Sequence, residues 1–163
     1  MCLGFYYKPC WDLGLRQASK GKNFSFKGKT FTVKVVDVYD GDTITVIMRR
    51  FGNLEQYRVR LMGFDSPEMK PPRNHPNREQ EINAARKSKN ALKNRIEESS
   101  NSVMLLQCHG WDKYGRILGT LWLPRCFYKC RWRRENINDY MIRHNYGYRY
   151  DGGTKKIPSY SGK

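Results

Sequence analysis

Two stretches decide the fold: Val35 to Val46, V-V-D-V-Y-D-G-D-T-I-T-V, and Arg58 to Lys70, R-V-R-L-M-G-F-D-S-P-E-M-K. Strand-like residues flank a glycine-containing turn at Phe51-Gly52-Asn53, which indicates a β-hairpin. Because the second strand of a hairpin retraces the first, the outer ends of the two strands finish close together. Four carboxylates are therefore expected to face one another at that end: Asp40, Asp42, Asp65 and Glu68.

Four gathered carboxylates repel one another unless a cation or a proton intervenes. Oxygen ligands suit calcium or magnesium, and neither stretch contains a His or Cys that would suit zinc. Asp-Gly-Asp is also a common turn sequence, because Asp tolerates turn geometry and Gly supplies a positive φ. The second acidic group and the arginines Arg58 and Arg60 before it instead favour a centre that cleaves phosphodiesters.

Composition indicates one domain that binds a polyanion. The chain has 163 residues and a formal charge of +16, which favours nucleic acid as the partner. No long basic amphipathic helix points to a membrane surface, and no apolar run approaches the roughly 20 residues of a membrane span. The first residues lack the pattern of a secretory signal, so we expect an intracellular protein, in cytoplasm or nucleus. We expect no obligate protein partner.

The five cysteines are an odd set, which does not indicate a complete disulfide framework. Cys108 lies in an apolar strand and is expected in the core. The remaining four have poor spacing for a zinc site, and buried hydrophobic cysteines are the alternative: Cys2, Cys10, Cys126 and Cys130.

The pattern along the chain predicts an α+β, mainly β fold: a five-stranded OB-fold barrel with a helix between strands 3 and 4 and a short C-terminal helix. We expect residues 1–28 to be a partly ordered extension, 29–150 the domain and 151–163 a basic flexible tail. The expected strands are Thr30–Val38, Thr43–Arg49, Glu55–Met62, Ser102–Cys108 and one from Ile117 that Pro124 ends; the expected helices are Arg78–Glu98 and Asn136–His144.

Two further segments have the residue types that bind nucleotides. Arg116 follows Gly115 at a turn, where a planar guanidinium can engage two phosphate oxygens, and Lys113 and Tyr114 lie beside it. The segment Cys126–Arg134 interleaves cations with aromatic residues, as base stacking requires, although a solvated basic loop with inward aromatics is equally compatible. Its candidate substrate contacts are Arg131, Trp132 and Arg133.

Three separated motifs resemble the staphylococcal nuclease-like (thermonuclease) domain family: V-Y-D-G-D-T, R-L-M-G-F-D-S-P-E and D-K-Y-G-R. The resemblance covers about Thr30 to Tyr150. It implies that Asp42 and Asp65 bind a calcium ion together with the backbone carbonyl of Ser66, where the family usually has Thr.

The same resemblance implies roles for the other candidates. Glu68 would orient or deprotonate the attacking water, while Arg60 and Arg116 would clamp the phosphate and stabilise its developing charge. Lys113 and Tyr114 would lie near a terminal phosphate of the substrate. Two residues would support the site by shaping its turn: Asp40 and Thr43.

The sequence also departs from the family. The segment between Trp122 and Asn136 is longer than in the compact bacterial enzyme, and no long final helix follows. The tyrosines that flank the family's nucleotide pocket cannot be assigned among three candidates, which are Tyr146, Tyr148 and Tyr150.

The leading hypothesis is a calcium-dependent endonuclease that cleaves DNA, preferably single-stranded, and RNA with little sequence preference and, by resemblance, leaves 3′-phosphate ends. The alternative is a non-catalytic nucleic-acid-binding OB module, since barrel and charge alone suffice for binding. A third is a module that docks on an acidic protein. Only the enzyme needs Glu68.

Overall fold

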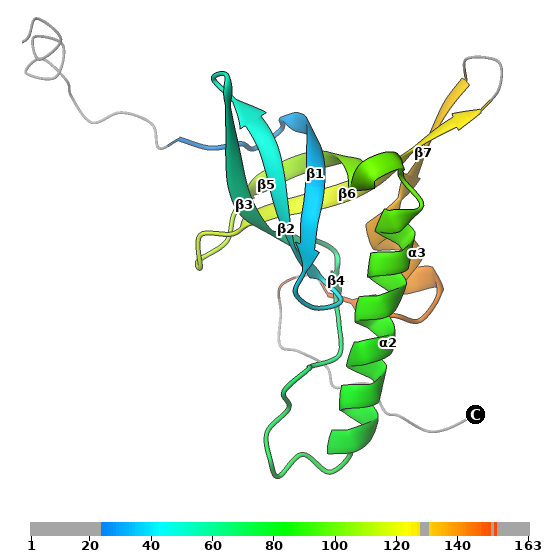
Figure 1. Ribbon diagram of the computed structural model, residues 1–163. Helices are drawn as coiled ribbons and strands as arrows, with labels where there is room; N and C mark the ends of the chain where they lie inside the picture. Colours follow the sequence, from blue (N-terminus) through cyan, green and yellow to red (C-terminus); the bar gives the residue numbers. More distant parts are fainter. Residues whose placement is uncertain (1–23, 128–130, 151, 153–163) are drawn as a thin grey trace, which may run out of the picture.

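The protein is described by a computed structural model that covers residues 24–127, 131–150 and 152, with the backbone alone at 125–127 and 131–133. Five strands form a closed barrel (Figure 1): β1 (Thr30–Val38), β2 (Thr43–Arg50), β3 (Asn53–Leu61), β5 (Val103–Trp111) and β6 (Ile117–Phe127). Neighbouring strands pair antiparallel in the order β3-β2-β1-β5-β6, and a parallel pairing of β3 with β6 closes the barrel. The expected OB-type fold class is confirmed.

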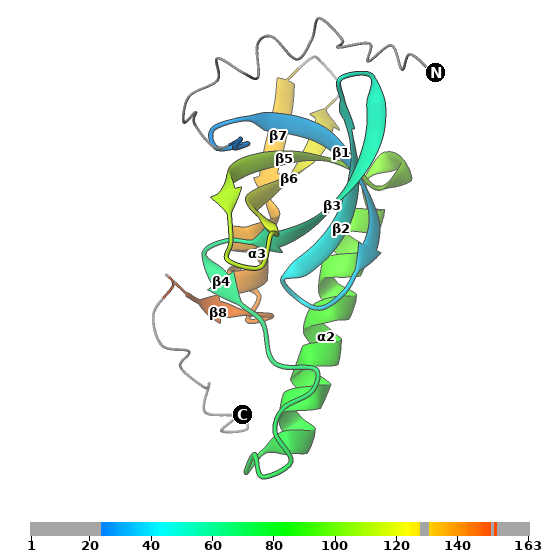
Figure 2. The same ribbon diagram turned by 90° about the vertical axis from the view of Figure 1, so that its left-hand side faces the viewer.

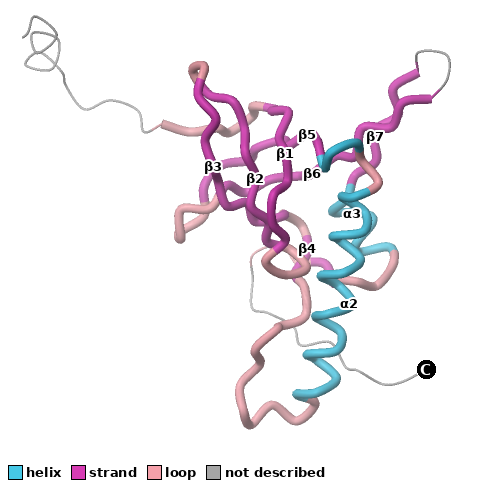
Figure 3. The backbone as a smooth tube through the Cα atoms, viewed as in Figure 1, coloured by secondary structure: helices cyan, strands magenta, loops and turns pink. Residues whose placement is uncertain are grey.

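The other elements lie outside the barrel wall. They are β4 (Phe64–Asp65), α2 (Arg78–Glu97), the 3-10 helix η1 (Ser100–Ser102), β7 (Arg131–Asn136), α3 (Ile137–Arg143) and β8 (Tyr148–Arg149). The tube in Figure 3 separates the strands of the barrel from the helices, which lie together on one side. Helix α2 is expected from the sequence, and its observed bounds differ from the expected ones by one residue.

The alternation of β3 explains which of its side chains reach the core. Val59 and Leu61 point inward and are fully buried, whereas Arg58 and Arg60 lie on the opposite face. Cys108 is likewise fully buried, as expected, and burial raises the pKa of its thiol to about 11. A thiol so protonated and enclosed acts as a small hydrophobic side chain.

Helix α2 buries polar as well as apolar side chains. Leu92 and Ile96 are buried, but three polar side chains are buried on the same helix: Glu81, Ser88 and Arg95. The N-terminal half of the helix extends beyond the end of the barrel and runs alongside the loop that follows β4 (Figure 2). The loop residue Glu68 donates its amide to the buried Glu81 of that half, while Arg95, near the other end of the helix, pairs with Glu98 and Glu135.

The expectation that Pro124 ends the fifth strand is wrong. Strand β6 continues to Phe127, and β7 pairs with it from Trp122↔Asn136 to Phe127↔Arg131. Pro124 is tolerated because it lies past Trp122, the last β6 residue that pairs with β5. The extra segment of this chain is thus a hairpin that projects from the barrel (Figure 1).

The C-terminal part of the domain is also more ordered than a loop. Tyr148 and Arg149 form β8, which pairs antiparallel with β4. A Cβ atom added at Gly147 would lie 2.5 Å from Phe64 Cδ2 and 2.9 Å from the Asp65 carbonyl oxygen. Only glycine permits this close approach, which brings Tyr148 beside Asp65.

The segment before β1 contributes to the core. Phe26 is 2% exposed and makes edge-to-face contacts with the rings of Phe31 and Tyr57. Residues 24–28, which the sequence assigns to an extension, therefore pack on the barrel. The expected extension at 1–23 and the expected tail at 153–163 lie outside the described residues.

Asn138 of α3 ties the helix to the barrel. Its side-chain oxygen accepts a hydrogen bond from the Leu121 amide at 3.0 Å, and its amide group donates to the carbonyl oxygens of Met62 at 2.8 Å and Gly119 at 3.1 Å.

Among the described helices, none is both long and apolar enough to cross a lipid bilayer.

Candidate active site

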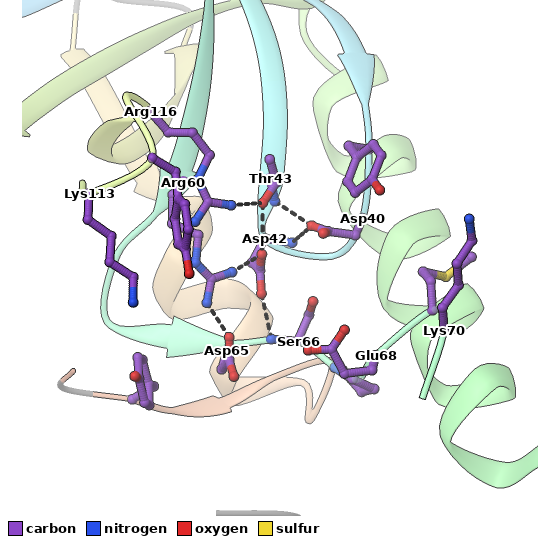
Figure 4. A pocket seen from close by; sticks show the side chains of 15 residues that line it. Asp40, Asp42, Thr43, Arg60, Asp65, Ser66, Glu68, Lys70, Lys113 and Arg116 are labelled. Atoms are coloured by element: carbon purple, nitrogen blue, oxygen red, sulfur yellow. Dashed lines mark hydrogen bonds and ion pairs between the residues drawn. The ribbon is translucent and has the colours of Figure 1, made fainter. Parts of the chain in front are cut away.

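The carboxylates and arginines predicted from the sequence converge on one hollow of about 610 Å³ at the end of the barrel (Figure 4). Ten predicted residues line it: Asp40, Asp42, Thr43, Arg60, Asp65, Ser66, Glu68, Lys113, Tyr114 and Arg116. Tyr150, one of the three candidate tyrosines, also lines it, and four residues that were not predicted complete the lining: Tyr39, Pro67, Met69 and Lys70. The side chains of Arg131, Trp132 and Arg133 lie outside the described part of the structure, so their predicted role stays a prediction.

The Arg60 guanidinium lies between two buried carboxylates. Its NH1 pairs with Asp42 Oδ1 and its NH2 pairs with Asp65 Oδ1. Asp42 is 4% exposed and Asp65 is 8% exposed. The positive charge offsets the repulsion that would otherwise separate two acids so close together.

Asp42 also receives hydrogen bonds that fix its orientation. Its Oδ2 accepts from the Ser66 amide at 2.7 Å, and its Oδ1 accepts from the Thr43 hydroxyl at 3.1 Å. The turn before β2 is thereby connected directly to the chain that follows β4.

Asp40 shapes the turn, as expected. Its Oδ1 accepts hydrogen bonds from the amides of Asp42 at 3.0 Å and Thr43 at 2.7 Å. Burial raises the pKa of the Asp40 carboxyl above its ordinary value, although the hydrogen bonds from Thr43 and the charges of Arg60 and Arg116 act in the opposite direction.

Gly41 lets helix α2 support this turn from behind. A Cβ atom at position 41 would lie 2.0 Å from Ser88 Oγ and 2.7 Å from Ser66 Cβ. Any side chain would push the helix or the β4 segment away. The glycine of Asp-Gly-Asp is therefore needed for close packing and not for the positive φ expected from the sequence, which Gly41 does not adopt.

Glu68 lies in the hollow on the side opposite Lys113 and Arg116 (Figure 4). Its position is set through the backbone, because its amide donates a 2.7 Å hydrogen bond to Glu81 Oε1 of α2. Glu81 is 3% exposed, and its other oxygen has no hydrogen-bond partner in the described residues. The sequence predicts a core role and no chemistry for this helix, and the burial of Glu81 is what connects it to the site.

Arg116 is held by a residue that the sequence reading also missed. Asp112 Oδ2 accepts from Arg116 Nε at 2.6 Å, and Asp112 Oδ1 accepts from the backbone amides of Tyr114 and Arg116, both at 2.8 Å. Arg116 NH1 is left 3.4 Å from the Thr43 hydroxyl, at the edge of the hollow. The aspartate of D-K-Y-G-R thus both folds the turn and aims the guanidinium.

Tyr148 contacts the acidic pair from the C-terminal segment. Its hydroxyl donates a 3.1 Å hydrogen bond to Asp65 Oδ2. Of the three tyrosines that the sequence left unassigned, Tyr150 lines the hollow and Tyr148 binds Asp65. Tyr146 instead packs near the rings of Tyr140 and His144.

The donor set fits a hard divalent cation. Asp42 and Asp65 direct one oxygen each at the same positive group, and neither His nor Cys lines the hollow. In the described residues no three Asp, Glu, His or Cys side chains are grouped as a metal site. Further ligands would therefore be backbone oxygens or water, both of which calcium accepts.

A family model described as staphylococcal nuclease homologue matches residues 58–160, well over half of the chain. The chain belongs to this family. The match includes all the predicted groups of the hollow from Arg60 onward, while the Asp40-Gly41-Asp42 turn precedes it and is placed beside them by the fold. A search of curated proteins found no match.

The hydrogen bond between Glu81 and the Glu68 amide gives a first prediction for this member of the staphylococcal nuclease homologue family. In Glu81→Ala, the amide of Glu68 loses its acceptor, and we expect its hydrogen exchange to become at least about tenfold faster, since local opening then costs less. Exchange of individual amides measured by NMR checks this result.

Glu79→Ala is the matched control, because Glu79 is an exposed residue of the same helical turn. Equal acceleration of Glu68 exchange in both variants would show that Glu81 does not position Glu68.

Asp112 gives a prediction for pH. Burial alone raises the pKa of its carboxyl, but the hydrogen bonds from Arg116 and Tyr114 outweigh burial and hold the pKa below the ordinary value of 3.8. Because the folded state lowers this pKa, the carboxylate stabilises the fold above that value and loses its contribution as pH falls through the folded pKa. Asp112→Asn should therefore be less stable than wild type near pH 6, with a difference that shrinks below about pH 4. Urea unfolding across this range measures it, and a constant difference would contradict it.

Proposed function

We propose that this protein is a calcium-dependent endonuclease that hydrolyses phosphodiester bonds of DNA, preferably single-stranded, and of RNA with little sequence specificity and leaves 3′-phosphate ends. One observation carries the proposal: a single hollow joins a buried acid pair, a separate glutamate and two arginines held in place by carboxylates. A barrel that only binds nucleic acid requires no such combination. Membership of the staphylococcal nuclease homologue family supports it.

Asp42 and Asp65, with the carbonyl oxygen of Ser66, would hold the calcium ion. When bound, the ion would supply positive charge to a nonbridging phosphate oxygen and so stabilise the charge that develops there. The oxygens of the two carboxylates are already directed at a cation, which is the Arg60 guanidinium. A calcium ion would take the place of the Arg60 guanidinium at these oxygens, which would leave Arg60 available to the phosphate.

Glu68 would accept a proton from the attacking water. Its carboxylate lies in the hollow, apart from the arginines, so water and phosphate can be held between the two sides (Figure 4). The amide bond to Glu81 fixes the backbone from which the carboxylate projects. A base placed in this way contributes typically 10²- to 10⁴-fold, as an order-of-magnitude range.

Arg60 and Arg116 would bind the phosphate and stabilise its added negative charge. The Arg116 guanidinium is held by Asp112 before substrate arrives, so it needs no reorganisation during the reaction. Removal of one such preorganised donor costs on the order of 10² to 10³ in turnover. Lys113 and Tyr114 would contact the neighbouring part of the substrate, since they line the same hollow.

The direct test is cleavage of single-stranded DNA by the purified protein in calcium and in excess chelator. We expect cleavage that requires calcium and that falls about 10³-fold in Glu68→Gln, because the base is lost while the shape is kept. Glu79→Gln removes an exposed carboxylate from α2 and serves as the control. DNA that binds but remains intact in both metal conditions would instead establish the non-catalytic binding module.

A further inference from the structure

A second hollow of about 450 Å³ adjoins the candidate active site. It is lined by Gln56, Tyr57 and Arg58 of β3 and by Tyr114, Gly115 and Arg116 of the turn between β5 and β6. Tyr114 and Arg116 line both hollows. The parallel pairing of Val59 with Ile117 keeps β3 and this turn side by side.

The two hollows differ sharply in charge. Four carboxylates line the first, whereas no acidic residue lines the second, which contains two guanidinium groups. Arg58 is exposed, and within the described part of the chain it forms no ion pair. Its charge is therefore available to an anion from outside the protein.

The arginines are arranged along one face of β3. Because strand side chains alternate, Arg58 shares its face with Arg60, about 7 Å further along the strand. Arg60 belongs to the candidate active site and Arg58 to the second hollow. The Arg58 guanidinium lies 5.2 Å from the ring centre of Tyr39, which lines the first hollow. The two arginines thus place positive charge in both hollows along one face of the strand.

An exposed ring marks the border between the hollows. Tyr114 is 71% exposed, and the Lys113 ammonium and Arg116 guanidinium lie 5.0 and 5.4 Å from its ring centre. Tyr57 adds a partly buried ring to the second hollow. Aromatic faces among cations are the combination that binds unpaired bases and their backbone.

We propose that the second hollow is a subsite for single-stranded nucleic acid, in which Arg58 binds a phosphate next to the one cleaved and Tyr114 stacks on a base. The inference rests on the proposed function, since it extends the path of the same substrate. Single strands are favoured because bases in a duplex already stack on each other and offer no free face to Tyr114. A hollow of this size accommodates a unit as large as a nucleotide.

The subsite is tested by binding rather than by cleavage. In a Glu68→Gln background with calcium present, fluorescence anisotropy would measure the affinity for end-labelled single strands of two and of six nucleotides at several salt concentrations. We expect the longer strand to bind more tightly. Arg58→Gln should remove most of this gain, about tenfold, and should reduce the slope of log affinity against log salt by about 0.7, the value of one phosphate contact on a single strand.

Two more variants make the result specific. Arg86→Gln removes the same charge from the exposed face of α2 and should leave both the gain and the slope as they were. Gln56→Glu places a carboxylate in the second hollow and should weaken the longer strand as Arg58→Gln does. Both altered side chains of the subsite are exposed, so these changes leave the core intact.

The outcomes for the two proposals are separate. Equal effects of Arg58→Gln and Arg86→Gln, or tighter binding of a six-base-pair duplex than of the single strand, would overturn the subsite even if the wild-type protein cleaves DNA. A specific loss in Arg58→Gln would support the subsite even if the wild-type protein cleaves nothing, in which case only the endonuclease proposal fails.

Discussion

The structure of the site depends on the need of two buried carboxylates for a shared positive charge. Two like charges about 4 Å apart repel by roughly 4 kcal/mol at an effective dielectric constant of 20. Asp42 precedes β2 and Asp65 belongs to β4, so the hairpin alone would bring this repulsion into the fold. Arg60, at the end of β3, pairs with both acids and removes it. Under the proposed function, a calcium ion would replace Arg60 at the same two acids.

The surrounding elements keep this arrangement close. Helix α2 packs against Gly41 through Ser88 and binds the Glu68 amide through Glu81, so one helix supports both acidic segments. Strand β8 brings Tyr148 to Asp65 from the C-terminal end. The burial of Glu81 and Ser88 on α2 is thus explained by the site that the helix supports, whereas the buried Arg95 pairs with Glu98 and Glu135.

Much of this site was predictable because its residues lie in turns whose partners follow from hairpin geometry. Strand alternation places Arg60 opposite Val59 and Leu61, and the Asp40 turn follows from local hydrogen bonding. The roles of Glu81 and Tyr148 were not predictable, because each depends on a contact between separate segments. Asp112 is different, since it contacts Tyr114 and Arg116 within its own turn, and the D-K-Y-G-R motif already contained that signal. The prediction that Pro124 ends the fifth strand was wrong because a proline ends a strand only where its missing N–H faces a partner strand.

The β6–β7 hairpin and β8 were also missed, because each strand forms only by pairing with another segment. The residue types at Tyr148 and Arg149 did not predict a strand, yet these two residues form one by pairing with β4. Conversely, the barrel itself was predictable, because five alternating segments with one helix inserted between the third and the fourth admit few arrangements. Local patterns therefore specified the barrel and the acidic turns, while tertiary contacts determined how the functional groups are aimed.

The most direct test of this account is calcium binding by isothermal titration calorimetry. The wild-type protein should bind one calcium ion at this site, and Asp65→Asn should weaken that binding at least about tenfold, since a carboxylate ligand is lost. Asp37→Asn changes an exposed aspartate of β1 and should bind calcium as the wild type does. Equal binding by all three proteins, or no saturable binding by the wild type, would contradict the assignment of the Asp42 and Asp65 pair as a cation site.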